Sequence, residues 1–388
     1  MSSPYSHRHF FRKIPPAQLA RYFAAKEIDL GIDFSTFTNK QVDSLFAAFL
    51  DLPEEQQTKI EAEFQDIHAM ACDGGVAAWI NEFNFHGDGG FVDEITKIDG
   101  LHAKVMWAFL EKPDYWHGAS LLLHADNVSS SYWKKRNELP PVPPNVEDKD
   151  IDNLAKAISG YFHKTEGRGK HCKVEPYRRN RKEYFFAYPE DFGLSEVEWV
   201  SRSLTSRARH PAFEIIFVYC EQEGSLDIYA PKNTKAVPEL QRIFAKTILY
   251  LETLADATID KRVYDLNPLA DADFAFAIEP ECEIERMEVV QLRLTLKFEQ
   301  KQKIILEADT KYNPQAVYDL LEKLKPPAHY ITQARIKVTF EPKAGRRTRT
   351  KAFNITYPNS LSLGHDGIDL QIRNILTKSG LEPRADAS

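Results

Sequence analysis

The first third of the chain repeats apolar residues at the spacing of an α-helix. Val42, Leu45 and Phe49 lie three or four residues apart, and they predict a helix over 39–51. A further apolar run predicts another helix over 95–111. We therefore expect the N-terminal part of the chain to fold as a helical domain.

A longer helix is expected between these two segments. Pro53 fits the first turn of a helix, where its missing N–H needs no partner, and two acidic residues follow it at the positive end of the helix dipole. Gly74 and Gly75 predict the end of the helix. The apolar residues at helical spacing are Ile60, Phe64, Ile67 and Ala71.

Beyond the helical part the pattern changes to strands. Val290, Leu292, Leu294 and Leu296 alternate with polar residues at the period of two that is typical of a β-strand. The other strands are expected over 172–177, 183–188, 213–220, 225–230, 303–308, 334–340 and 350–356, and helices over 151–162, 237–254, 313–324 and 368–379. A hairpin followed by a helix thus recurs three times, either as a duplicated module or as the ordinary pattern of an antiparallel sheet.

These patterns predict the α+β class, with a helical N-terminal domain followed by an antiparallel or mixed α+β region of hairpin-then-helix units. Four prolines within 137–148 predict an extended, semi-rigid linker. We expect an acidic helical domain at 1–136, the linker at 137–148, an α+β domain with a basic loop at 149–270, and a ββαββα domain with a basic hairpin at 271–388.

Composition narrows the class of protein. Apolar residues make up 43% of the 388 residues and charged residues 28%, which excludes a disordered chain. No apolar stretch approaches the roughly 20 residues of a membrane helix, and the N-terminus lacks a secretory signal. The four cysteines form no CxxC pair, which favours reduced thiols in a cytoplasmic protein.

Charge is unevenly distributed along the chain. Residues 1–150 contain 14 basic and 23 acidic side chains, whereas residues 301–388 contain 15 basic and 9 acidic ones. A basic surface attracts polyanions, and an acidic one can dock a basic partner. The sequence therefore predicts different partners for the two ends of the chain.

The strongest basic segment lies at 164–182. Its eight cations are interleaved with Tyr and Phe, which can stack on bases while Lys and Arg neutralise phosphates. One alternative is a solvated hairpin whose charges pair with Glu166, Glu175 and the acidic N-terminal domain, and another is a site for a small anionic ligand. The eight cations are Lys164, Arg168, Lys170, Lys173, Arg178, Arg179, Arg181 and Lys182.

A second basic segment lies at 343–351, at the tip of a predicted hairpin. Arginine forks suit phosphate oxygens, although charged tips also protect sheet edges. The candidate binding residues here are Arg346, Arg347, Arg349 and Lys351. We expect Arg178, Arg179 and Arg181 of the first segment and Arg346, Arg347 and Arg349 of the second to be exposed.

Enzymatic motifs are sparse. The sequence contains no Walker A loop, GxGxxG, GxSxG or HExxH motif, and it predicts no cofactor and no catalytic residue. His68 and Cys72 lie four residues apart on one helix face, but no second pair of metal ligands follows. Glu214, Asp227 and Lys232 lie on or after a predicted hairpin, without the close Glu-x-Lys spacing of a nuclease.

The sequence favours a non-enzymatic binding protein. Its partner would be nucleic acid or a nucleoprotein, contacted through 164–182 and 343–351, with a protein docked on the acidic N-terminal domain. The alternative is a protein-binding adaptor whose basic segments meet an acidic protein. A third interpretation is a metal-dependent nuclease.

Overall fold

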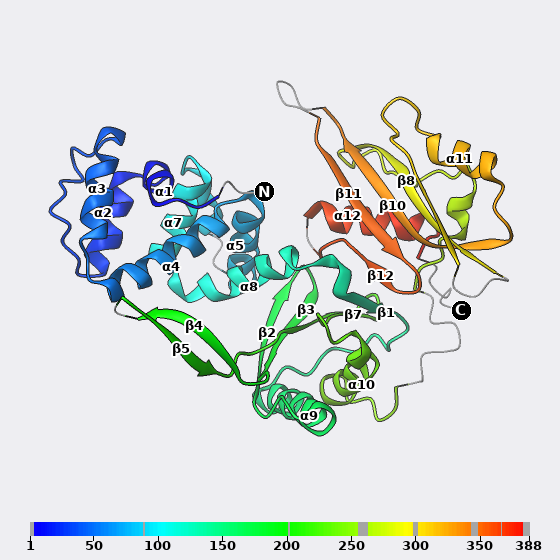
Figure 1. Cartoon of the computed structure of the whole chain (residues 1–388), viewed down its shortest axis with the longest axis horizontal. Coiled ribbons are helices and arrows are strands. Elements are labelled where there is room, and N and C mark those ends of the chain that lie inside the picture. The colour runs from blue at the N-terminus through cyan, green and yellow to red at the C-terminus, as the bar shows by residue number, and fades with distance from the viewer. Residues whose placement is uncertain are drawn as a thin grey trace. The chain divides into compact units, whose positions relative to one another are not determined.

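The structure is a computed structural model that describes residues 4–87, 90–200, 202–254, 263–297, 302–342, 348–365 and 367–382. By its internal contacts the chain divides into two compact units. One comprises Met1–Val128 with Arg178–Asn180, and the other Ser129–Tyr177 with Arg181–Ser388. The first unit is helical and the second contains antiparallel sheets (Figure 1), so the predicted α+β class is confirmed. The four-part division of the chain stays a prediction.

The first unit contains eight α-helices in its described residues. They are α1 (His7–Lys13), α2 (Pro16–Ala25), α3 (Val42–Leu50), α4 (Glu54–Met70), α5 (Asp73–His86), α6 (Phe91–Thr96), α7 (Leu101–Glu111) and α8 (Trp116–Asn127). The helix expected over 39–51 is confirmed as α3. Aromatic side chains fill the core. Phe64 is fully buried, and its ring centroid lies 4.6 Å from that of Phe10 and 4.8 Å from that of Tyr22.

The expectation that Gly74 and Gly75 end a helix is wrong, because both lie in the first turn of α5. The α4 helix already ends at Met70, and the Cys72 thiol caps α5 by accepting the Gly75 N–H at 3.3 Å. A Cβ at Gly75 would lie 2.0 Å from the Met70 carbonyl oxygen. These glycines therefore permit a tight turn between two helices.

The single helix expected over 95–111 is also wrong. Gly100 has a φ of 84°, which is far from helical, and it separates α6 from α7. Only glycine adopts this conformation without strain. The apolar periodicity continues across the break because both helices face the same core.

The second unit contains a five-stranded antiparallel sheet, called the first sheet, in the order β1-β7-β6-β3-β2. Its strands are β1 (Trp133–Arg136), β2 (Cys172–Arg179), β3 (Lys182–Pro189), β6 (Ile215–Cys220) and β7 (Ser225–Tyr229). Helices α9 (Asp148–Glu166) and α10 (Val237–Ile248) cover one face (Figure 1), where Phe162 and Phe244 pack against Phe185 and Phe217. The expected strands are confirmed, and β1 had not been predicted.

The proline-rich segment at 137–148 is extended and lies against this sheet. The Leu139 N–H donates to the Gly224 carbonyl, and the Tyr219 hydroxyl donates to the carbonyls of Pro140 and Val142 at 3.1 and 2.8 Å. The Asn145 N–H donates to the Ile248 carbonyl at the end of α10. The segment is therefore bound along the second unit over most of its length.

A second sheet follows in the order β12-β11-β10-β8-β9. Its strands are β8 (Ile284–Leu296), β9 (Lys303–Glu307), β10 (His329–Phe340), β11 (Thr350–Thr356) and the short β12 (Ser360–Leu361). Helices α11 (Ala316–Leu324) and α12 (Gly367–Lys378) pack on one face, where Val317 and Ile372 join the core. Figure 1 shows α12 behind this sheet.

Strands β4 (Leu194–Val200) and β5 (Ser203–Arg209) form a separate two-stranded ribbon that the sequence did not predict. The ribbon is inserted between β3 and β6 and extends away from the first sheet (Figure 1). Every side chain of its strands is exposed. No helix in the described part of the chain has the length and apolar character needed to cross a bilayer.

Candidate functional site

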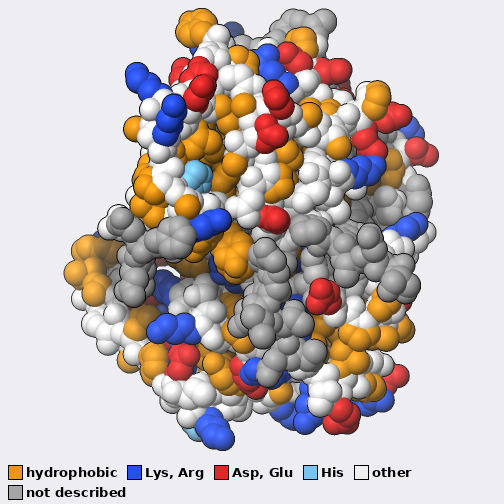
Figure 2. Space-filling view, turned by 90° about the vertical axis from the view of Figure 1, so that its right-hand side faces the viewer, with side chains coloured by type: hydrophobic (Ala, Val, Ile, Leu, Met, Phe, Trp, Pro, Cys, Tyr) orange, Lys and Arg blue, Asp and Glu red, His pale blue; other side chains and the backbone are white. Residues whose placement is uncertain are grey.

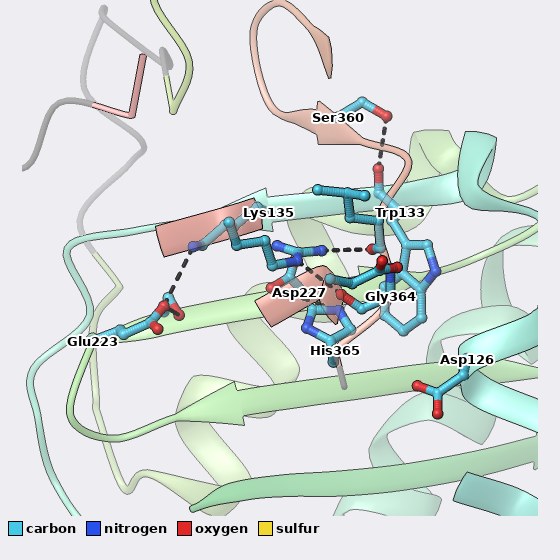
Figure 3. A network of polar contacts seen from close by, with 12 residues as sticks. Asp126, Trp133, Lys135, Glu223, Asp227, Ser360, Gly364 and His365 are labelled. Carbon is cyan, nitrogen blue, oxygen red and sulfur yellow. Dashed lines mark hydrogen bonds and ion pairs between the residues drawn. The ribbon is translucent and has the colours of Figure 1, made fainter. Parts of the chain in front are cut away.

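A buried ionic cluster joins the two sheets of the second unit. Lys135 and Asp227 are cross-strand neighbours on β1 and β7, so their side chains leave the same face of the first sheet, opposite α9 and α10. The Lys135 ammonium lies 2.6 Å from Glu382 Oε1 and 3.4 Å from Glu223 Oε2, and His365 Nε2 lies 3.9 Å from Asp227 Oδ2. Figure 3 shows Lys135, Glu223, Asp227 and His365 converging.

The C-terminal half supplies the other side of this cluster. From α12, the Arg373 guanidinium donates to the carbonyls of Gly364 and Leu363 at 2.9 and 2.8 Å. The Ser360 hydroxyl donates to the Trp133 carbonyl at 3.0 Å, which ties β12 to β1 (Figure 3). These contacts hold the first sheet against the second.

Burial and charge shift the protonation equilibria of the cluster. Burial lowers the pKa of Lys135, but the carboxylates, Glu382 foremost, outweigh it and raise the pKa overall. Lys182, also buried, has a lowered pKa because burial exceeds the attraction of Glu223. Burial raises the pKa of the Tyr264 hydroxyl. Lys135 is therefore firmly charged, whereas Lys182 is held at a site that disfavours its charge.

The charges of this cluster are close to balanced. Its cations Lys135, Lys182 and Arg373 face the carboxylates of Glu223, Asp227 and Glu382. Of the nuclease candidates, Asp227 belongs to the cluster, Glu214 is half-buried and Lys232 is exposed. In the described ranges no group of three His, Cys, Asp or Glu side chains could hold a metal ion.

Of the charged residues and the histidine in this cluster, those missing from the sequence prediction are Lys135, Glu223, His365, Arg373 and Glu382. Each stands in a segment of ordinary local pattern, and no motif distinguishes it. Asp227 could be singled out from the sequence, because it is an acidic residue within an apolar strand. A buried acid on a strand needs a partner, but Lys135 comes from β1 and His365 from the segment just before α12, and only the fold brings them to Asp227.

Much of the first basic segment serves the protein's own structure. Arg168 bonds Asp191 and Asn233 at 2.8 and 2.5 Å, and its guanidinium carbon lies 4.1 Å from the Phe213 ring centroid. Arg168 also pairs with Glu166. The guanidinium group of Arg168 is thus engaged by contacts within the protein, next to the start of the ribbon.

The expectation that the arginines of this segment are all exposed is wrong at Arg179. Its side chain is fully buried and forms two parallel bonds of 2.8 and 2.7 Å to the Asp126 carboxylate. Lys182 is buried in the cluster described above, and Lys173 pairs with Glu175. The cations that remain exposed are Lys164, Lys170, Lys173, Arg178 and Arg181.

The second basic segment is only partly within the described residues. Arg346 and Arg347 lie outside them. Arg349 is exposed, with its guanidinium carbon 5.0 Å from the Phe340 ring centroid. Lys351 is half-buried and pairs with Asp369. This segment connects β10 to β11, so it belongs to the second sheet.

The face of the second sheet opposite its core is polar. The strand register places Glu307, Gln291, Arg335 and Asn354 side by side across β9, β8, β10 and β11. The next row contains Ile305, Arg293, Gln333 and Thr356, and Lys303 and Thr295 lie beyond it. In a third row, Lys337 on β10 lies between Glu288 on β8 and Ala352 on β11. Arg286 and Thr339 are opposite each other in the row beyond. We call these residues the open face. Its positions on β9 and Arg286, Arg335, Ala352 and Asn354 are exposed. Gln291, Arg293, Gln333, Lys337 and Thr356 are half-buried, and Glu288, Thr295 and Thr339 are buried.

Cations outnumber carboxylates on the open face. Arg286 and Lys337 lie 3.2 and 3.8 Å from Glu288 and neutralise it. By contrast, neither Arg293 nor Arg335 forms an ion pair or side-chain hydrogen bond within the described residues. The face thus presents five cations against two carboxylates, and two of its guanidinium groups are free to bind an anion.

Figure 2 views the molecule from the right-hand side of Figure 1, where α11 lies, and shows acidic and basic side chains interspersed on that side. A groove of about 520 Å³ lies beside α11, lined by Ala270, Asp273, Tyr318 and Glu322 among others. Its carboxylates disfavour a polyanion. A polyanion is therefore attracted more strongly to the open face, which has a surplus of cations, than to this groove.

The ribbon separates charged from apolar side chains. On one face, Glu196 pairs with Arg209, and Glu198 lies 3.7 Å from Arg207. The opposite face carries no acidic or basic side chain along its paired strands and exposes Val197, Trp199 and Leu204. No described residue covers this face, because all side chains of the two strands are exposed.

His68 and Cys72, considered as a metal pair, have separate roles. His68 Nδ1 lies 3.0 Å from His102 Nε2, and Cys72 caps α5.

A comparison with models of known protein families and with the sequences of curated proteins found no match to this chain.

Proposed function

We propose that the protein is a non-enzymatic binding protein that contacts nucleic acid through the open face of the second sheet. The observation that carries this proposal is the pair Arg293 and Arg335, two arginines on a net basic face that form no ion pair or side-chain hydrogen bond with another described residue. Arginine binds phosphate oxygens bidentately, and a surplus of cations attracts a polyanion. The hairpin that contains Arg349 extends from the same sheet.

The first basic segment supports this function less well. Arg168 and Arg179 are engaged in ion pairs, and Lys182 is buried. Removing Arg168 and Arg179 from those contacts would break the ion pairs that these two side chains form within the protein. We therefore assign the main contact to the open face, with the exposed Lys164 and Lys170 as the competing location.

Fluorescence anisotropy tests the proposal with a labelled single strand and its duplex, titrated at salt concentrations from about 50 to about 200 mM. We expect wild-type affinity to fall steeply with salt. In Arg293→Ala/Arg335→Ala the slope of log K against log salt for a single strand should fall by about 1.4, because each phosphate contact contributes about 0.7. The matched control is Lys164→Ala/Lys170→Ala, which should keep the wild-type slope.

Two results would overturn this assignment. If the wild-type protein binds neither oligonucleotide at the lowest salt, it is not a nucleic-acid-binding protein. If the control variant loses affinity while Arg293→Ala/Arg335→Ala binds as wild type does, the first basic segment is the site.

A second candidate function, a protein-binding adaptor, is favoured by the apolar face of the ribbon. Among the described residues, six of the fifteen large exposed hydrophobic side chains lie between Phe192 and Leu204. Exposed apolar patches mark protein interaction sites. Because both arginines of the opposite face are paired with glutamates, the ribbon offers a protein partner more than it offers a polyanion.

Crosslinking in cells followed by mass spectrometry would test the adaptor. A partner captured by the wild type should be lost in Val197→Ser/Trp199→Ser/Leu204→Ser and kept in Glu198→Gln/Arg207→Gln, which changes only the charged face. The purified partner should then bind the wild type and the Glu198→Gln/Arg207→Gln variant more tightly than the triple serine variant. Equal capture by both variants would reject the ribbon as the contact.

The cytoplasm is the compartment that we propose for this activity. All four cysteines are free thiols: Cys72, Cys172, Cys220 and Cys282. Free thiols are typical of reducing compartments.

A further inference from the structure

Two tyrosines lie together at one end of the open face. Tyr330 is the cross-strand neighbour of Thr295, so its ring leaves β10 on the same face as Arg293. Tyr357 follows β11, and its N–H donates to the Thr332 carbonyl. The two ring centroids are 6.5 Å apart with an interplanar angle of 65°.

Both rings are exposed at the surface of the second sheet. Tyr330 is 37% exposed and Tyr357 39% exposed. Neither hydroxyl forms a hydrogen bond to another described residue. Neither ring fills the core, and neither hydroxyl satisfies a buried polar group. Packing within the described residues therefore does not explain why tyrosines occupy these two positions.

The neighbours of the tyrosines complete a surface for unpaired nucleotides. Arg293 lies two residues from Thr295 along β8, and Ile305 is its exposed partner on β9. In the row beyond, the amides of Gln291 and Asn354 flank Arg335. Rings and an apolar side chain can stack on bases, guanidinium groups can hold phosphates, and amides can bond base edges.

We infer that the open face binds single-stranded nucleic acid in preference to a duplex, with bases stacked on Tyr330 and Tyr357. This inference rests on the proposed function and names its substrate class. The bases of a duplex are stacked on one another, so their faces are closed to a flat sheet, whereas unpaired bases can stack on exposed aromatic rings. The arginines attract either form through charge, and the tyrosines favour the single strand over the duplex.

The test uses the full chain and four probes: a short thymidine single strand, an abasic strand of equal length, a duplex and heparin. Wild-type protein should bind the thymidine strand more tightly than the abasic strand or the duplex. Tyr330→Leu and Tyr357→Leu should each lower affinity for the thymidine strand about fivefold or more, the effect of losing one stacked base. Their affinities for the abasic strand and heparin should not change.

Two matched controls separate stacking from other effects. Tyr330→Phe keeps the ring and should bind the thymidine strand as wild type does. Tyr312→Leu removes a tyrosine that is 88% exposed and lies outside the strands, and it should also leave affinity unchanged. Circular dichroism and thermal melting should confirm that all variants fold.

The outcomes distinguish this inference from the proposed function. If the wild type binds duplex and abasic strand as tightly as the thymidine strand and the leucine variants are neutral, the single-strand inference is wrong while nucleic-acid binding stands. If none of the four polyanions binds, both are wrong. If only heparin binds, the face is a general anion surface and the inference is again overturned.

Discussion

Lys135 and Glu382 are 247 residues apart in the chain, yet Nζ of one lies 2.6 Å from Oε1 of the other inside the second unit. Both side chains are nearly inaccessible, at 5% and 2% exposure. The pair joins β1 of the first sheet to the chain that follows α12. It therefore links the two halves of the second unit across almost its entire sequence.

Breaking this pair on one side should be severe. Lys135→Met leaves Glu382 buried without its cation, and the free energy of unfolding should fall by about 3–5 kcal/mol in urea titrations. The double variant Lys135→Met/Glu382→Leu replaces the pair with apolar side chains and should regain most of that loss. As a control, Lys59→Met removes an exposed pair with Glu55 and should change stability by less than about 0.5 kcal/mol. Equal losses in the single and double variants would contradict this account.

Arg179 should matter to stability and its neighbours should not. Arg179→Ala deprives Asp126 of a bidentate partner and removes a fully buried side chain, so we expect a loss of about 3–5 kcal/mol. Arg179→Lys cannot form the two parallel bonds and should recover only part of the loss. Arg181→Ala, at an exposed position, should stay within about 0.5 kcal/mol of wild type. Thermal melting of the three variants would reject this assignment if Arg181→Ala were the most damaging.

Acid should destabilise the helical unit through His102. Burial, followed by the charges of His68, His9 and Lys13, lowers the pKa of His102 from 6.5 to about 4. Between these values the unfolded chain binds a proton that the folded protein does not, so stability is present above pH 6.5 and is lost as the pH falls toward 4.

His102→Gln keeps a hydrogen-bonding neighbour for His68 and removes the titration, so its melting temperature should fall less over this range than that of the wild type. The exposed His117→Gln serves as the control and should follow the wild-type curve. A wild-type melting temperature that does not change across this range would refute the role of His102.

Truncation can test where the second unit begins. A chain that starts at Ser129 keeps β1, Lys135 and the extended segment at 137–148, whereas one that starts at Glu147 loses a sheet strand and leaves Glu382 unpaired. We expect the longer fragment to be the more stable in urea, by several kcal/mol. Equal stability of the two fragments would show that the segment before 147 is a dispensable linker.

Local patterns were enough to predict most of the fold. The alternation through Leu292 and Leu294 predicted β8, and the helical spacing of Val42, Leu45 and Phe49 predicted α3, because side-chain periodicity follows from backbone geometry alone. The ribbon was missed for the same reason. Its apolar residues lie on both faces, Leu194 and Val200 on one and Val197 and Trp199 on the other, so the strand shows no clean period of two.

The sequence by itself determined the α+β class and the two basic segments, since both follow from neighbours along the chain. Only the tertiary structure decided which cations are free. Arg179 and Arg181 are two residues apart, yet one meets Asp126 in the interior and the other faces solvent. Arg293 and Arg335 stand out in no sequence window, and strand register places them on one face. A charge is neutralised or left free by the groups that surround it in space, and pairing between distant strands, not sequence proximity, brings those groups together.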